Sequence, residues 1–195
     1  RPPMPDDLRP QVQPILDAVE AMGLPLLRIS GVEADDVIGT LSRQATEKGM
    51  ETVVSTGDKD LTQLVDEHVT LIDTMKEIRT DRDGVKAKFG IWPEQVVDYL
   101  AFVGDVSDNI PGVPNIGPVK AANLLNEYGT AENVIERAPE ISGKLGEYVR
   151  DSIEELKLSR KLATIKTDVD LDVSIDDLKA SDGDTDTLRK LYSHY

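Results

Sequence analysis

Three short segments of this chain concentrate carboxylates. They contain Glu33, Asp35 and Asp36, then Asp58 and Asp60, and finally Asp105 and Asp108. The sequence has no cysteine, so disulfides and thiolate metal sites are excluded, and its two histidines, His68 and His194, lie too far apart in the sequence to favour a zinc centre. Any bound metal would therefore be held by oxygen, and carboxylate oxygens suit magnesium or manganese.

The elements expected around the first two acidic segments place both at one edge of a sheet. Short strands are predicted at residues 24–29, 51–55 and 69–72, with a helix at 34–48 and a shorter one after Asp60. Strands that alternate with helices predict a parallel sheet with helices packed on it. In such sheets ligand sites collect beyond the carboxyl ends of the strands, which is where these acids fall.

Each acidic segment also has a purely structural interpretation. Ser30 with Glu33 fits a capping box, Asp60 with Gln63 resembles a helix cap, and the segment from 104 to 109 is rich in turn-forming residues. Repetition favours a functional site, because two like charges near 4 Å repel by about 4 kcal/mol at an effective dielectric near 20 and so require a cation.

A group of carboxylates without histidine or cysteine suits hydrolysis by two metal ions. One ion would activate water and the other would stabilise the leaving oxygen of a phosphodiester, so no side chain need attack phosphorus. Lys59 lies between two of the acids and is a candidate catalytic residue that could contact the scissile phosphate. An exposed lysine at the start of a helix is the alternative interpretation of Lys59.

From about residue 83 the pattern changes to helices joined by short turns. Helices are predicted at 85–89, 93–103, 119–128, 131–137 and 145–158. The turn from Gly112 to Gly117, followed by Pro118, would present backbone amides and Lys120 to a phosphate, although an ordinary loop between helices has the same composition. Residues 165–173 alternate in polarity, which is compatible with a returning strand or with a surface segment.

Composition limits the class of protein. The 195 residues are 39% hydrophobic, enough for one domain or two small ones. With no apolar run long enough for a bilayer and no signal-peptide pattern at the start, we expect a cytoplasmic protein with no membrane partner. The net charge of −15 argues against nucleic acid, but much of the acid is concentrated between residues 168 and 186, where it can lie away from a DNA-binding face.

Three motifs, in order, resemble the 5′ nuclease domain of bacterial DNA polymerase I, within the flap endonuclease superfamily. They are Gly-Val-Glu-Ala-Asp-Asp at 31–36, Ser-Thr-Gly-Asp-Lys-Asp at 55–60 and Gly-Asp-Val-Ser-Asp-Asn-Ile-Pro-Gly-Val at 104–113. The third is highly specific, and the resemblance spans nearly the whole chain. It implies an α/β fold of the PIN or flap-endonuclease type, a partial parallel sheet with flanking helices plus a helical subdomain with a helix-hairpin-helix element.

The resemblance also assigns roles to residues. Glu33, Asp35 and Asp36 would serve one magnesium or manganese region, Asp58 and Asp60 would link to it, and Asp105 and Asp108 would complete a second. Residues implied to contact DNA, with a potassium ion at the hairpin turn, are Arg1, Gly112, Val113, Asn115, Gly117 and Lys120. The expected substrate is a 5′-flap or nicked duplex, cut during primer removal and repair, and polymerase domains are commonly linked to this family.

Two departures from the family leave alternatives open. The family's domain begins with a strand that carries a metal-binding aspartate and with a basic arch, and neither precedes Arg1. Lys120 also lies one place further from Gly117 than in many relatives. The alternatives are therefore a fragment that binds DNA without cutting it and a receiver-like α/β protein with one magnesium. We expect a nuclease core at 1–80, a helical DNA-binding subdomain at 81–160 and an acidic segment returning to the core at 161–195.

Overall fold

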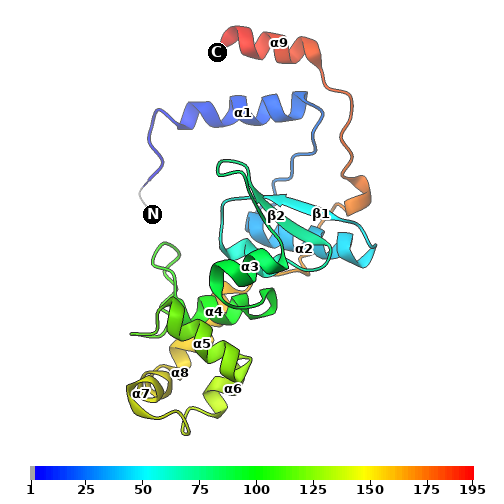
Figure 1. Ribbon diagram of the computed structural model, residues 1–195. Coiled ribbons are helices and arrows are strands. Elements are labelled where there is room, and N and C mark those ends of the chain that lie inside the picture. The colour runs from blue at the N-terminus through cyan, green and yellow to red at the C-terminus, as the bar shows by residue number, and fades with distance from the viewer. Residues whose placement is uncertain (1–2) are drawn as a thin grey trace. The chain divides into compact units, whose positions relative to one another are not determined.

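The computed structural model describes residues 3–195 and divides into two compact units (Figure 1). One unit joins the first 34 residues to residues 170–195, and the other spans Asp35–Val169. No helix in the described part of the chain combines the length and apolar character needed to cross a bilayer. Each unit is described by itself below.

The unit Asp35–Val169 contains a three-stranded mixed sheet in the order β1-β2-β3. Strand β1 (Thr52–Ser55) is parallel to β2 (Val69–Asp73), and β2 is antiparallel to β3 (Ile78–Thr80). The short 3-10 helix η1 (Asp60–Leu64) lies in the crossover between β1 and β2, which a parallel pair requires. The predicted α/β class with a partial parallel sheet is confirmed.

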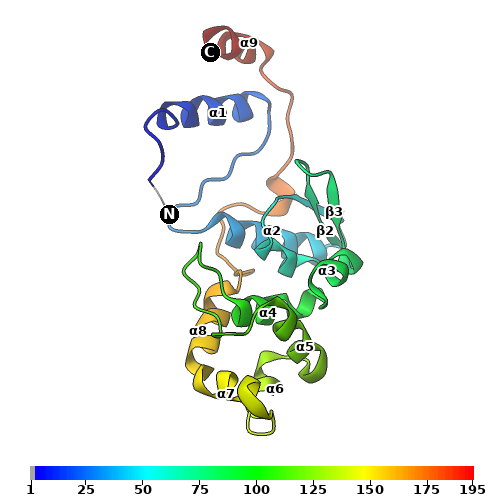
Figure 2. The same cartoon turned by 60° about the vertical axis from the view of Figure 1, so that its left-hand side comes forward.

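Helices make up the rest of this unit (Figure 2). They are α2 (Ala34–Glu47), α3 (Arg82–Phe89), η2 (Pro93–Gln95), α4 (Val96–Val103), α5 (Pro118–Tyr128), α6 (Ala131–Glu136), α7 (Gly143–Asp151) and α8 (Ile153–Ala163). Helix α4 packs against α5, α8 and η1, so it connects the sheet side of the unit with its helical side.

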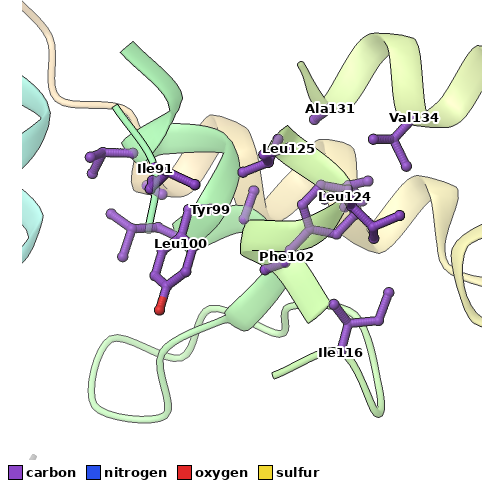
Figure 3. Close-up of a cluster of buried hydrophobic side chains, with 14 of the residues drawn as sticks. Ile91, Tyr99, Leu100, Phe102, Ile116, Leu124, Leu125, Ala131 and Val134 are labelled. Atoms are coloured by element: carbon purple, nitrogen blue, oxygen red, sulfur yellow. The ribbon is translucent and has the colours of Figure 1, made fainter. Parts of the chain in front are cut away.

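Helix α4 occupies the centre of the hydrophobic core because it is apolar around nearly its whole circumference. Phe102 and Ala101 are fully buried, and the ring of Tyr99 meets that of Phe89 edge to face at 5.5 Å. Figure 3 shows α4 side chains among those of α5 and α6, including Leu124 and Val134. This packing fixes the direction in which α4 ends, and its last residue precedes the third acidic segment.

The other unit consists of α1 (Arg9–Ala21), the 3-10 helix η3 (Ile175–Asp177) and α9 (Thr185–His194). Helix α1 packs against α9. The chain segments beside these helices are joined by backbone hydrogen bonds from Ser181 N to Gly23 O at 2.8 Å and from Asp184 N to Ala21 O at 2.7 Å. These bonds hold the segment that follows α1 beside the segment that precedes α9.

Several predicted elements differ from the structure. The strand predicted at 24–29 is wrong, because those residues pair with no described strand and Pro25 lacks an amide proton for a ladder. The helix predicted at 145–158 is two helices, since Ser152 leaves helical geometry (φ −122°, ψ 25°) and ends α7 before α8 begins. The antiparallel β3 was not predicted, and it depends on a turn with Glu77 at a φ of +57°.

Residues 165–173 form a surface segment and no strand. Lys166 N donates to Asp36 Oδ1 at 2.9 Å, and Val169 N donates to Thr40 Oγ1 at 3.1 Å. Ile165 and Lys166 pass so close to Gly39 of α2 that a Cβ there would lie 2.7 Å from the Ile165 side chain. The segment therefore hydrogen-bonds to side chains of a helix instead of joining the sheet.

Candidate metal centre and nucleic-acid interface

Three of the predicted carboxylates converge in space. Asp60, Asp105 and Asp108 each offer an oxygen, and these oxygens lie within 4.8 Å of one another. Asp60 follows β1 in the crossover to β2, whereas the other two belong to the loop after α4. Segments about 45 residues apart therefore meet because α4 packs against η1.

Local hydrogen bonds set the position of Asp60. Asp58 N donates to Thr56 Oγ1 at 3.0 Å, and Asp60 N donates to Asp58 Oδ1 at 2.9 Å. Two successive side-chain turns thus bring the chain from β1 into η1. Gln63 then holds η1 against the end of α8, because its amide donates to Ala163 O at 2.9 Å and accepts from Ile165 N at 3.0 Å.

A tight loop sets the position of Asp105. Gly104 ends α4 with a φ of +73°, and Asp105 and Ile110 exchange backbone hydrogen bonds of 3.0 and 2.8 Å across the loop. Asp105 Oδ1 accepts from Ser107 N at 2.7 Å and from Asp108 N at 3.4 Å. These bonds engage Oδ1 within the loop, whereas Oδ2 contacts a partner from another segment.

Lys59 supplies that partner. Its Nζ lies 2.6 Å from Asp105 Oδ2, and this hydrogen bond is the main cause that raises the pKa of Lys59 and lowers the pKa of Asp105. The pKa of Asp60 is instead raised to about 6, first by burial and then by the negative charge of Asp58. Neighbouring carboxylates therefore have pKa values shifted in opposite directions, which is common at functional sites.

The donor set fits a hard divalent cation. Oδ1 of Asp60 is buried and has no hydrogen-bond partner among the described residues. A buried carboxylate oxygen of this kind is unfavourable unless a cation or donor satisfies it. Converging carboxylate oxygens without histidine or cysteine are typical of magnesium or manganese sites.

The remaining predicted acids are not members of this group. Asp36 lies in the first turn of α2 and accepts the hydrogen bond from Lys166 N. Asp35 is half-buried in the same turn. Asp58 is exposed and acts on Asp60 through the backbone hydrogen bond and its charge. Glu33 belongs to the unit that contains α1 and α9.

The turn from Gly112 to Gly117 is fastened directly to the acidic loop. Gly112 has a φ of +66°, and a Cβ on it would lie 2.7 Å from Gly104 N. Its own amide donates to Ser159 Oγ of α8 at 2.9 Å in a fully buried contact. Val113 N donates to Phe102 O at 2.8 Å, so the turn follows α4 closely.

The residues predicted to contact DNA at this turn differ in exposure. Asn115, Gly117 and Lys120 are exposed, and a Cβ on Gly117 would meet no atom of residues 3–195 within 4 Å. Lys120 Nζ donates to Asn115 O at 2.8 Å and lies 5.6 Å from the centre of the Tyr148 ring. The Val113 side chain is buried, so contact through this residue would have to involve its backbone. Arg1 lies outside the described residues.

Other residues that shape the site were not found from the sequence. These residues are Ser159, Asp98 and Gln63, and each forms its hydrogen bonds with a segment distant in the sequence. Buried Asp98 accepts from Arg160 Nε at 2.6 Å and from Ala131 N at 2.8 Å, joining α4, α8 and α6. The signal that the sequence offered was a polar residue within an otherwise apolar helix, as for Asp98 in α4, because such a residue is usually paired when it is buried.

Family models match the chain in two consecutive parts. Residues 1–90 match the N-terminal resolvase-like domain of 5′-3′ exonucleases, and residues 91–186 match the C-terminal SAM fold of the same enzymes. The chain belongs to the 5′-3′ exonuclease family. This division differs from the two compact units and from the boundaries predicted at residues 80 and 160, which stay predictions.

Individual relatives agree with this assignment. The chain is 50% identical to DNA polymerase I of Pseudomonas aeruginosa, covering 98% of the chain and 22% of that protein. It is 39% identical to the 5′-3′ exonuclease of Aquifex aeolicus, covering 97% of the chain and 65% of the relative. The chain thus spans about a fifth of the polymerase and nearly two thirds of the exonuclease.

Solved structures share the fold. The T5 D15 protein co-crystallised with metal ions is 25% identical and superposes with a TM-score of 0.68, covering 73% of this chain and 55% of that one. The catalytic core of Rad2 in complex with DNA substrate is 14% identical, has a TM-score of 0.58 and covers 99% of this chain and 66% of that one. The Rad2 likeness concerns the fold alone.

Proposed function

We propose that this chain is part of a structure-specific 5′ nuclease that hydrolyses DNA phosphodiesters at 5′ ends or 5′ flaps during primer removal and repair. The observation that carries the proposal is the group Asp60, Asp105 and Asp108, whose carboxylate oxygens lie within 4.8 Å of one another. In this group Oδ1 of Asp60 is buried and has no hydrogen-bond partner among the described residues. Family membership and the metal ions of the T5 D15 crystals support it.

In this proposal Asp60, Asp105 and Asp108 hold a magnesium or manganese ion, and the other predicted acids of the same unit, Asp35, Asp36 and Asp58, serve a second. The bound pair would supply an activated water and stabilise the leaving oxygen. The chain's own residues orient the site. Asp105 Oδ1 is held by its loop amides, and Lys59 provides a positive charge for the scissile phosphate.

The turn from Gly112 to Gly117 would hold duplex DNA through its phosphates. Gly117 leaves room for a phosphate to approach the main chain at the start of α5, and Lys120 lies in the first turn of that helix. Such contacts position DNA without reading its sequence. The same proposal includes a potassium ion at this turn and a role for Arg1 in DNA contact. It also includes a covalently linked polymerase, as the length of the Pseudomonas relative suggests.

A second candidate is a DNA-binding polypeptide that does not complete the reaction. It is favoured by the observation that only three of the seven predicted acids form the group, and that Asp36 already accepts a hydrogen bond from Lys166. In that case the chain would bind flap DNA in the presence of magnesium without cutting it.

A labelled 5′-flap duplex separates these candidates. The chain, both alone and within the natural polypeptide that contains it, is incubated with the duplex in magnesium, manganese or EDTA. Asp105→Ala and Asp108→Ala should lower cleavage by about 100-fold or more while DNA affinity, measured by fluorescence anisotropy in EDTA, changes less than about threefold. Glu154→Ala, which removes an exposed acid on α8, is the matched control.

The outcomes are distinct. Normal cleavage by both aspartate variants would show that the metal assignment is wrong. Metal-independent cleavage would exclude the proposed chemistry altogether. Tight binding of the flap without cleavage in either preparation would favour the second candidate, and a failure to bind branched DNA would exclude both.

A further inference from the structure

The ammonium group of Lys59 contacts one of the carboxylates that would bind a divalent cation. Its Nζ lies 2.6 Å from Asp105 Oδ2, and it stands in the sequence between Asp58 and Asp60. The Lys59 side chain is 42% exposed, whereas that of Asp105 is 13% exposed. The ammonium group thus reaches from solvent into the acidic group, and it differs in this respect from a lysine that lies along the surface.

One oxygen of Asp105 accepts the hydrogen bonds from its own loop, and Lys59 contacts the other oxygen. Asp105 Oδ1 is committed to the amides of Ser107 and Asp108. Oδ2 is the remaining oxygen, and it accepts the short hydrogen bond from Lys59. A metal ion that uses Oδ2 as a ligand therefore competes with the ammonium group for the same atom.

Repulsion within the group explains why a cation is needed there before metal binds. Oxygens of three carboxylates lie within 4.8 Å of one another, and like charges at this distance repel strongly where water is partly excluded. The same repulsion would push the loop of Asp105 away from η1. Lys59, the residue immediately before η1, offsets that repulsion and holds the loop in place.

We propose that Lys59 is an internal counter-ion that holds Asp105 Oδ2 in the metal-free protein and gives it up when a divalent cation binds. Lys59 is in this sense a positioning residue. It keeps the acidic group assembled without metal and lowers the affinity for the ion. Once displaced, its ammonium group is free to contact an anionic group of a substrate beside the site.

The inference rests on the proposed function only in that Asp60, Asp105 and Asp108 bind a divalent cation. The inference predicts a direction for the change in metal affinity on removal of Lys59, and other roles of Lys59 do not predict the same direction. A lysine that only contacts substrate phosphate would leave metal affinity unchanged when removed. A lysine that is required to shape the metal site would weaken metal binding when removed. Removing a competing counter-ion would instead strengthen metal binding.

The test measures manganese affinity by isothermal titration calorimetry, without DNA, on wild type and three variants. Lys59→Met, which keeps the length of the side chain without its charge, should bind manganese about tenfold more tightly. Lys59→Arg should stay close to wild type. Lys157→Met removes the same charge from an exposed ion pair on α8 and should change affinity by less than about twofold.

A second readout uses the metal-free protein in EDTA. Lys59→Met should lower the melting temperature by about 2–4 °C, because the uncompensated carboxylates repel. Added magnesium should then raise the melting temperature of Lys59→Met by more than it raises that of wild type.

Equal or weaker manganese binding by Lys59→Met would overturn the counter-ion role while leaving the metal site intact. A failure of wild type to bind manganese at all would instead remove the metal assignment in the proposed function, and the inference with it. The first result concerns the variant and the second concerns wild type, so the two failures are distinguishable.

Discussion

The ammonium group of Lys59 and the carboxylate of Asp105 meet at 2.6 Å, although 46 positions separate them in the sequence. This contact joins the segment after β1 to the loop after α4. The loop in turn touches the hairpin turn through the backbones of Gly104 and Gly112. The candidate metal centre and the candidate DNA-binding turn are therefore parts of one connected arrangement around the C-terminal end of α4.

Asp60→Asn should stabilise the metal-free protein at neutral pH. Burial and neighbouring acids raise the pKa of Asp60 to about 6, above its ordinary value of 3.8. The folded protein therefore keeps this proton where the unfolded chain releases it, and stability falls as the pH rises from about 4 to 6. Above that range the ionised carboxylate destabilises the folded state. The substitution should therefore raise the free energy of unfolding by on the order of 1 kcal/mol, after allowance for partial solvent exposure.

The measurement is thermal unfolding in EDTA at pH 4 and pH 7.5. The gain from Asp60→Asn should be present at pH 7.5 and small at pH 4, where Asp60 is largely protonated. With saturating magnesium, wild type should instead unfold at the higher temperature, because only wild type keeps all three carboxylate ligands. A substitution that destabilises the metal-free protein at pH 7.5 would contradict this account of Asp60.

Gly112→Ala should destabilise the fold by more than about 2 kcal/mol. The residue has a φ of +66°, and the new Cβ would lie 2.7 Å from Gly104 N, which cannot move without displacing the end of α4. Urea unfolding measures the change. Gly117→Ala is the matched control, since the φ of Gly117 is an ordinary −92° and no atom of the described part of the chain lies within 4 Å of its Cβ position. The free energy of unfolding of this variant should change by less than about 0.5 kcal/mol.

Gly117→Ala should nevertheless weaken DNA binding. A methyl group at the start of α5 keeps a phosphate from approaching the free amides there, so affinity for duplex DNA should fall about tenfold regardless of sequence. Anisotropy with two duplexes of unrelated sequence measures the effect. Unchanged affinity in this well-folded variant would show that phosphate does not approach the turn at Gly117.

Asp98→Ala should cost about 2–3 kcal/mol of stability. The Asp98 side chain is 6% exposed and accepts hydrogen bonds from Arg160 Nε and from Ala131 N, and its loss leaves a buried amide without a partner. Glu132→Ala provides the comparison, because Glu132 pairs with the same arginine at 2.9 Å but is 54% exposed. Its loss should cost less than about 1 kcal/mol, and equal effects of the two variants in urea unfolding would contradict the importance of burial.

Ser159→Ala should cost about 1–2 kcal/mol, because the buried Gly112 amide would lose the hydroxyl oxygen to which it donates at 2.9 Å. Hydrogen exchange at the Gly112 amide should accelerate more than exchange at amides in the middle of α5. Uniform acceleration across the helices would indicate a general loss of stability instead of a local one.

Much of the fold followed from local patterns. Apolar spacing and stop signals located α2, α5 and α6 within one or two residues, and β-branched runs located β1 and β2. Helical periodicity and strand composition are local properties, so a single sequence records them. The strand prediction for residues 24–29 was wrong because a strand also requires a second strand to pair with it, which is not a local property.

The sequence by itself determined that the chain lacks thiolate ligands, that its candidate metal-binding acids lie in three segments and that a glycine-bounded turn precedes α5. Only the tertiary structure decided which acids meet. Asp60 joins Asp105 and Asp108 because α4 packs on η1, while Asp36 turns to Lys166 N because residues 165–169 run along α2. Such convergence depends on packing between segments far apart in the chain, and local residue preferences carry no information about it.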